Sequence, residues 1–86
     1  MPEVSRFYGI IIRMYVDEHN PSHFHAYYGN YTAAFDIKTG NVSYGKLPRK
    51  QTALITAWTL IHQKELLKNW NELMSGGESN KIAPLK

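Results

Sequence analysis

The stretch from Phe7 to Val16 alternates as a β-strand does. Its even-numbered positions are all apolar, whereas the odd-numbered ones mix apolar residues with Gly9 and charged Arg13. Because successive side chains of a strand point to opposite faces, the even positions are predicted to face a core, with Arg13 on the outer face. We expect one strand over about residues 6–16, ended by a polar loop.

Alternating stretches also lie on both sides of Gly29-Asn30, a pair that suits a two-residue hairpin turn. Pairing the residues that flank this turn gives cross-strand neighbours of matching character on each face. The apolar set joins Tyr28 to Tyr31, Ala26 to Ala33 and Phe24 to Phe35, and the outer set joins Tyr27 to Thr32, His25 to Ala34 and His23 to Asp36. Strands over about residues 23–28 and 31–38 follow from this register.

The next turn signal is Thr39-Gly40. A hairpin at this turn sets Ile37 against Val42 and extends the apolar face with Phe35 against Tyr44. A further strand is therefore expected over about residues 41–45. Agreement of two hairpins on one apolar face predicts an antiparallel meander of three to four strands.

A helical region follows, since Pro48 suits a first helical position and no further Pro or Gly occurs before Gly76-Gly77. Two apolar stripes lie on nearly opposite sides of this region. The first contains Leu54, Ala57, Trp58 and Ile61, and the second contains Leu66, Leu67, Trp70, Leu73 and Met74. We therefore predict a bend or break near residues 62–65, with helices over about 48–62 and 64–75 packed on one sheet face.

The alternative is a straight helix whose second stripe is covered by a partner chain, which would make the protein an obligate oligomer such as a homodimer. Residues 76–86 are expected to form a tail that docks through Ile82 and Leu85.

The composition fits one small α+β domain over residues 1–86, because this length is too short for two cores. Cysteine is absent, which excludes disulfides and thiolate metal sites, and we expect a cytoplasmic protein. No membrane association is expected, since no apolar stretch approaches the roughly 20 residues that span a bilayer. Ten Lys and Arg against seven Asp and Glu give a net charge of +3, which favours anionic partners.

Three of the four histidines lie close together, at positions 19, 23 and 25. The alternation places His23 and His25 on one strand face, about 6.5 to 7 Å apart. With His19 from the loop they form a three-nitrogen set suited to zinc, and Asp36 or a loop carboxylate can add an oxygen ligand. Histidines also occur on polar sheet faces that bind no metal, and the spacing matches no unique metal signature.

A second interpretation of the same residues is acid–base chemistry without a metal. Asp36 faces His23 in the predicted register and can orient its ring, with His25 beside it as a second proton-transfer group. Arg13 on this face can neutralise a phosphate, and together these groups suit cleavage of RNA by its own 2′-hydroxyl. The alternative is a solvated sheet face whose His23–Asp36 pair contributes well under about 1 kcal/mol. Whether the protein is an enzyme stays open.

Three cations surround the start of the predicted helix, at Lys46, Arg49 and Lys50. Cations at this end oppose the helix dipole, so they slightly disfavour the helix. Together with free backbone N–H groups they suit an anion such as a nucleic-acid phosphate. An ordinary solvated first turn explains them as well.

Five ordered blocks of the chain form a familiar pattern: 1–7, 19–26, 36–40, 45–49 and 81–85. Together they resemble the small bacterial family catalogued as domain of unknown function 4160, over essentially the whole chain. The family usually has two prolines in the histidine block, and Ser22 stands in place of the second. The resemblance implies no established activity, but members are discussed as components of toxin–antitoxin pairs beside another small protein.

We therefore expect a small α+β protein that binds or cleaves RNA within a toxin–antitoxin-like pair. His23, His25 and Asp36 would form its polar site, and Arg49 and Lys50 would contact phosphate. The competing hypotheses are a metal-binding module and a pure interaction module that binds a cognate small protein through its helical face.

Overall fold

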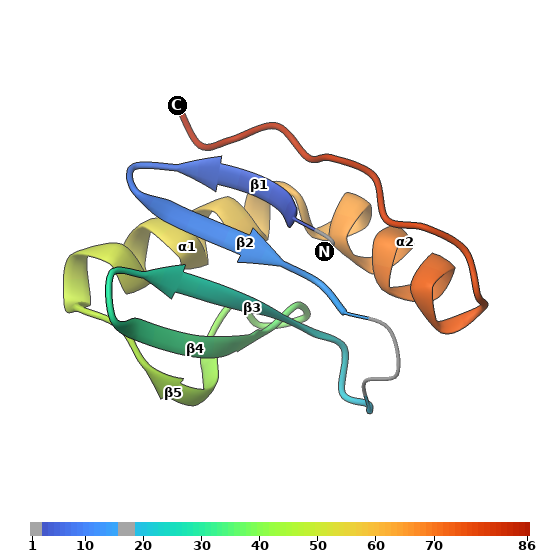
Figure 1. Cartoon of the computed structure of the whole chain (residues 1–86), viewed down its shortest axis with the longest axis horizontal. Helices are drawn as coiled ribbons and strands as arrows, with labels where there is room; N and C mark the ends of the chain where they lie inside the picture. Colours follow the sequence, from blue (N-terminus) through green and yellow to red (C-terminus); the bar gives the residue numbers. More distant parts are fainter. Residues whose placement is uncertain (1–2, 16–18) are drawn as a thin grey trace.

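The computed structural model describes residues 3–15 and 19–86 as a five-stranded antiparallel sheet followed by two helices. The α+β class is as predicted, although the sheet has one or two strands more than expected. Both helices lie on the same face of the sheet (Figure 1). The elements in chain order are β1 (Glu3–Phe7), β2 (Ile10–Arg13), β3 (His23–Tyr28), β4 (Tyr31–Asp36), β5 (Val42–Lys46), α1 (Arg49–Ile61) and α2 (Gln63–Met74).

The single strand predicted over residues 6–16 is wrong, because a hairpin divides it. Tyr8 and Gly9 both have positive φ, at 49° and 79°, and β2 turns back to pair with β1. Positive φ at both central residues is what a tight hairpin of type I′ requires. Tyr-Gly is not one of the common pairs for such a turn, so the alternation pattern concealed it. Val16 lies outside the described residues.

The core lies between the helices and one sheet face. Phe24 stacks on Phe35 with ring centroids 5.5 Å apart, and the edge of Trp58 packs against Phe24 at 5.6 Å. Ile10 and Ile12, two of the even positions expected in the core, are fully buried. The apolar face predicted from the alternation is therefore correct for β2, β3 and β4.

The register between β3 and β4 is the predicted one, from Tyr28 opposite Tyr31 to His23 opposite Asp36. The register between β4 and β5 differs, because Phe35 faces Val42 instead of Tyr44. The turn is longer than Thr39-Gly40, and a bulge adds one residue to β5. An extra residue moves the following side chains to the other face of a sheet.

The helical region breaks where the two stripes change sides. His62 separates α1 from α2 with φ −108° and ψ 24°, so the straight-helix alternative is wrong. In α1 the buried side chains are Ile55, Trp58 and Thr59, whereas Ile61 is 66% exposed. The predicted first stripe therefore lies on a different side of α1 from the buried one. Apolar residues surround most of this helix, so its sequence does not indicate which side is buried. In α2 the stripe is correct except for Met74, which is exposed.

The C-terminal tail is fixed along the edge of β1. The buried amide of Asn69 donates to the Asn80 carbonyl at 2.8 Å and accepts from the Asn80 N–H at 3.0 Å. Further along, the Ile82 N–H donates to the Val4 carbonyl at 2.7 Å, and Trp58 Nε1 donates to a tail carbonyl at 2.9 Å. Ile82 is buried and Leu85 packs against the core, as predicted. No helix in the described part of the chain has the length and apolar character needed to cross a membrane.

Candidate functional site

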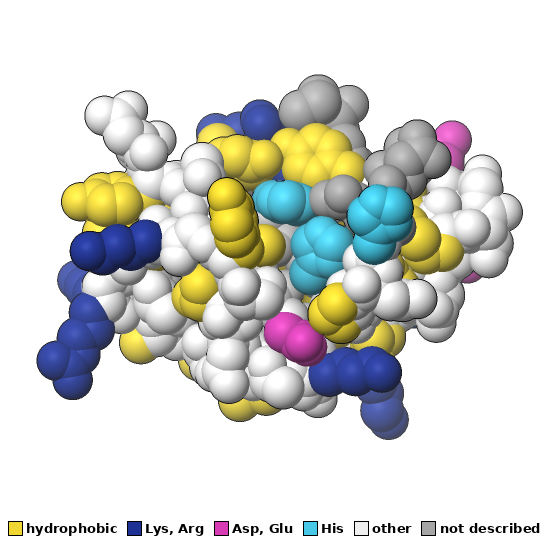
Figure 2. All heavy atoms as spheres, turned by 90° about the horizontal axis from the view of Figure 1, so that it is seen from below, with side chains coloured by type: hydrophobic (Ala, Val, Ile, Leu, Met, Phe, Trp, Pro, Cys, Tyr) yellow, Lys and Arg dark blue, Asp and Glu magenta, His cyan; other side chains and the backbone are white. Residues whose placement is uncertain are grey.

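The helices leave one face of the sheet uncovered, and most of the predicted site residues lie there (Figure 1). We call this surface the open face, and it carries Arg13, Tyr15, His23, His25, Tyr27, Ala34, Asp36, Tyr44 and Lys46. Figure 2 shows histidine side chains gathered in one patch beside hydrophobic side chains. The alternation of the strands is what brings these residues to one side.

One row of cross-strand neighbours crosses the open face from β2 to β5. Arg13 faces His25, His25 faces Ala34, and Ala34 faces Tyr44. His25 and Tyr44 are therefore two strands apart, which corresponds to about 9–10 Å between backbones. Ala34 between them is only 7% exposed, whereas Tyr44 is 81% exposed. The row combines a cation, an imidazole and an exposed aromatic ring.

Tyrosines connect this row to its neighbours. The guanidinium carbon of Arg13 lies 5.1 Å from the centre of the Tyr27 ring, a cation–π arrangement. The Tyr27 hydroxyl shares a hydrogen bond of 2.6 Å with the Tyr15 hydroxyl, and the Tyr15 ring meets His25 at 5.1 Å. Burial, reinforced by the hydrogen bond with Tyr15, raises the pKa of Tyr27 to about 12. Its hydroxyl is therefore neutral at physiological pH.

His23 and His25 are neighbours, as the alternation predicts. Their ring centroids lie 5.2 Å apart, and the Trp70 ring of α2 lies 5.2 Å from the His23 ring, so α2 reaches this end of the open face. His23 Nδ1 lies 2.9 Å from the Pro21 carbonyl oxygen. A carbonyl only accepts, so Nδ1 carries the proton and Nε2 is the basic nitrogen of the neutral ring.

Asp36 lies opposite His23 in register, but Oδ1 of its carboxylate closes the turn that follows β4. Asp36 Oδ1 accepts hydrogen bonds from the backbone N–H groups of Lys38 at 2.7 Å and Thr39 at 3.3 Å. This is the local turn geometry that aspartate favours. The orienting role that the sequence assigned to Asp36 is filled at His23 Nδ1 by the Pro21 carbonyl. Because this acceptor is a backbone carbonyl, the pattern of side chains could not predict it.

The three histidines of the predicted zinc set are described, whereas the loop carboxylates that could join them, Asp17 and Glu18, lie outside the described residues. Over residues 3–15 and 19–86, no group of three histidine, aspartate or glutamate side chains is placed to hold a metal ion. His19 is exposed in the loop before β3. The fourth histidine, His62, belongs elsewhere: its Nδ1 lies 2.6 Å from Glu65 Oε1 and its ring packs against Trp58.

The predicted anion-binding cations divide between two places. Arg13 lies within the open face, where its Nε is buried without a hydrogen-bond partner and no ion pair joins it to a described carboxylate. Lys46 ends β5 beside the row of Tyr27 and Thr32. Arg49 and Lys50 are exposed in the first turn of α1, which has no acidic residue. The cations at positions 46, 49 and 50 are thus remote in register from the His23 end of the sheet.

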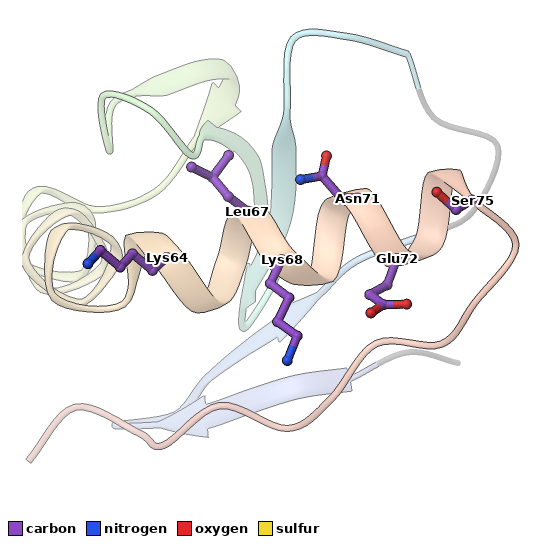
Figure 3. Close-up of a pocket in the computed structure, with 6 residues that line it drawn as sticks. All are labelled: Lys64, Leu67, Lys68, Asn71, Glu72 and Ser75. Atoms are coloured by element: carbon purple, nitrogen blue, oxygen red, sulfur yellow. The ribbon is translucent and has the colours of Figure 1, made fainter.

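A separate hollow of about 520 Å³ lies along α2, at Lys64, Leu67, Lys68, Asn71, Glu72 and Ser75 (Figure 3). Its side chains come from one helix and its end and project to different sides, so no second element encloses a ligand. None of the predicted site residues lines this hollow.

The profile of the family described as "Domain of unknown function (DUF4160)" matches residues 9–71. The chain belongs to this family. The match begins at Gly9 in the β1–β2 turn and covers β2 to β5, α1 and most of α2. No curated protein and no solved structure matches this DUF4160 chain.

The chemistry available to the DUF4160 chain on its open face is stacking, anion binding and proton transfer. Exposed aromatic rings stack on nucleobases, and guanidinium or ammonium groups bind phosphate. Two adjacent imidazoles can accept one proton and donate another. Tyr44 was not among the predicted site residues, because the bulge that turns its side chain outward left no sequence signal.

Proposed function

We propose that this DUF4160 chain binds single-stranded RNA on the open face of its sheet. The observation that carries the proposal is the cross-strand row in which Arg13, His25, Ala34 and Tyr44 follow one another on a face that no helix covers. In this arrangement a base stacks on the exposed Tyr44 ring, and its phosphate is neutralised by Arg13 or Lys46. The net charge of +3 favours such a partner.

Two features support a single strand over a duplex. Aromatic side chains stack on bases only when the bases are unstacked from their neighbours, which is the condition of single strands and loops. The open face is also the broad surface of a five-stranded sheet, which cannot enter the deep and narrow major groove of double-stranded RNA. Both points favour a splayed strand lying across β3, β4 and β5.

His23 and His25 extend the proposal from binding to cleavage. One imidazole removes the proton of a 2′-hydroxyl, whose oxygen attacks the adjacent phosphorus. The bond from phosphorus to the 5′-oxygen breaks, and the second imidazole protonates the leaving oxygen. The products are a 2′,3′-cyclic phosphate and a 5′-hydroxyl, with no metal required. A chain with this activity would need a cognate small protein to restrain it, as in a toxin–antitoxin pair.

The proposal is tested by fluorescence anisotropy with a labelled single-stranded oligoribonucleotide. Tyr44→Ala should weaken binding about 5- to 150-fold, the effect of losing one stacked base. Lys46→Ala should reduce the dependence of affinity on salt by about one counterion.

Two surface variants remote from the open face serve as controls. Lys64→Ala removes an equally exposed lysine from α2, and Ile61→Ala removes an exposed apolar side chain from α1. Neither should change the affinity by more than about twofold. If Lys64→Ala and Lys46→Ala lowered the affinity equally, the binding would be nonspecific attraction between charges. Full affinity in Tyr44→Ala would refute the proposed surface.

A further inference from the structure

A second hollow lies at the end of the molecule where the β1–β2 turn, the β3–β4 turn and the start of α1 come together (Figure 1). Its volume is about 450 Å³, and it is lined by Tyr8, Tyr28, Lys50, Gln51 and Leu54. Small-molecule sites commonly measure about 300–1,000 Å³. None of the lining residues belongs to the open face.

Two tyrosine rings form the aromatic side of this hollow. Tyr8 is 58% exposed at the tip of its hairpin. Its ring plane lies at 84° to that of Phe7, and the two ring centroids are 6.4 Å apart. Tyr28 lies close to the hairpin backbone, since a Cβ at Gly9 would be 3.4 Å from Tyr28 Cε1. The turn thus holds both rings at the same opening.

The backbone of Tyr8 indicates that its ring does more than complete a turn. Its φ of 49° is one that glycine and asparagine adopt at lower energy than an aromatic residue. An exposed ring recovers little of this energy through burial in the folded chain. Strained backbone conformations of this kind cluster at ligand-binding sites.

The remaining lining residues supply the other parts of a nucleotide site. Leu54 offers an apolar surface, and the Gln51 amide can both donate and accept hydrogen bonds at the edge of a base. Lys50 is an exposed ammonium group, and no acidic residue in the first turn of α1 neutralises it. The combination fits a planar, polar-edged ring that carries an anion.

We infer that this hollow binds one nucleotide of an RNA strand, with the base against Tyr8 and Tyr28, its edge at Gln51 and its phosphate at Lys50. The identity of the ligand rests on the proposed RNA binding, whereas the hollow itself rests on its own residues. An RNA strand would then have two contact points, one at this end of the molecule and one on the open face.

The test is an NMR titration of the full chain with adenosine 5′-monophosphate, adenosine and inorganic phosphate. We expect saturable shifts of the Gly9 amide and the Gln51 side-chain amide with the nucleotide, and weaker binding of adenosine. Tyr8→Asn is the informative variant, since asparagine favours this φ and forms the preferred Asn-Gly turn. It should keep the fold and weaken nucleotide binding at least about fivefold.

Lys50→Gln should remove the advantage of the nucleotide over the nucleoside, while the matched variant Lys64→Gln should retain it. Undiminished binding by Tyr8→Asn, or equal shifts with phosphate alone, would overturn the inference. An oligoribonucleotide that shifts only open-face residues would also overturn it while sparing the proposed function. Nucleotide binding in the hollow without any oligoribonucleotide on the open face would support the hollow and refute the open face.

Discussion

Gly45 is the position where a single added methyl group should be most damaging to the sheet. It lies in β5 with φ +83°, and a Cβ there would be 2.5 Å from the Thr32 carbonyl oxygen and 2.9 Å from Ala33 Cα. Both atoms belong to the backbone of β4, so neither can move without displacing the strand. Gly45→Ala therefore combines an unfavourable φ with a steric overlap.

The magnitude follows from comparison with Gly29→Ala. Gly29 also has positive φ, at +55°, but a Cβ there meets nothing within 4 Å. Gly29→Ala should cost only the left-handed conformation, about 1–2 kcal/mol of unfolding free energy. Gly45→Ala adds an overlap of the kind that costs about 1–3 kcal/mol more. The lower entropy of the unfolded alanine chain offsets both variants equally, so it cancels in the comparison.

Urea unfolding followed by tryptophan fluorescence measures the difference, because Trp58 and Trp70 are both buried. In thermal unfolding, the same additional 1–3 kcal/mol should lower the melting temperature of Gly45→Ala by about 4–24 °C relative to Gly29→Ala, at about 4–8 °C per kcal/mol. Circular dichroism should show that both variants fold at low temperature. Equal stability of the two variants would mean that β5 does not approach β4 this closely, and the reasoning would fail.

Three further predictions concern other parts of the molecule. Asn69→Ala removes both hydrogen bonds to Asn80, so it should lower the unfolding free energy by about 1–3 kcal/mol and speed hydrogen exchange at Ile82; unchanged exchange would contradict the role of Asn69. Tyr27 ionises in the unfolded chain near its ordinary pKa of about 10 but in the folded chain only near about 12, so its contribution to stability is complete below pH 10 and is lost as the pH rises toward 12. Urea unfolding between pH 9 and 12 should show this decline and should show less of it in Tyr27→Phe. Joint replacement of His23 and His25 by alanine should abolish formation of 2′,3′-cyclic phosphate ends on RNA, and continued cleavage would exclude both as proton-transfer groups.

The sequence predicts those parts of the fold in which local signals agree. Gly29-Asn30 and matching side chains on both faces determine the β3–β4 register, and with it the shared face of His23 and His25. The break at His62 follows from apolar stripes on opposite sides of the helical region. The position of the break is therefore correct even though Ile61 of the predicted first stripe is exposed.

The features that escaped prediction depend on backbone conformations that side-chain patterns do not encode. The hairpin at Tyr8 uses an aromatic residue at positive φ. Tyr44 points outward only because a bulge adds a residue to β5. The Pro21 carbonyl orients His23 through an atom that every residue possesses. The predicted site therefore differs from the observed one at a turn, at a bulge within β5 and at a backbone acceptor, and not in the β3–β4 register.

The tail fixed along β1 also limits how copies of this chain can associate. A continuous sheet grows only when each copy offers two unpaired edges, one for each neighbour. Here the tail lies along the β1 edge (Figure 1) and the Ile82 N–H donates to the Val4 carbonyl, and β5 is the opposite edge of the sheet in the described residues. Strand pairing between copies therefore stops at two, and a fibre built by such pairing would first require the tail to detach.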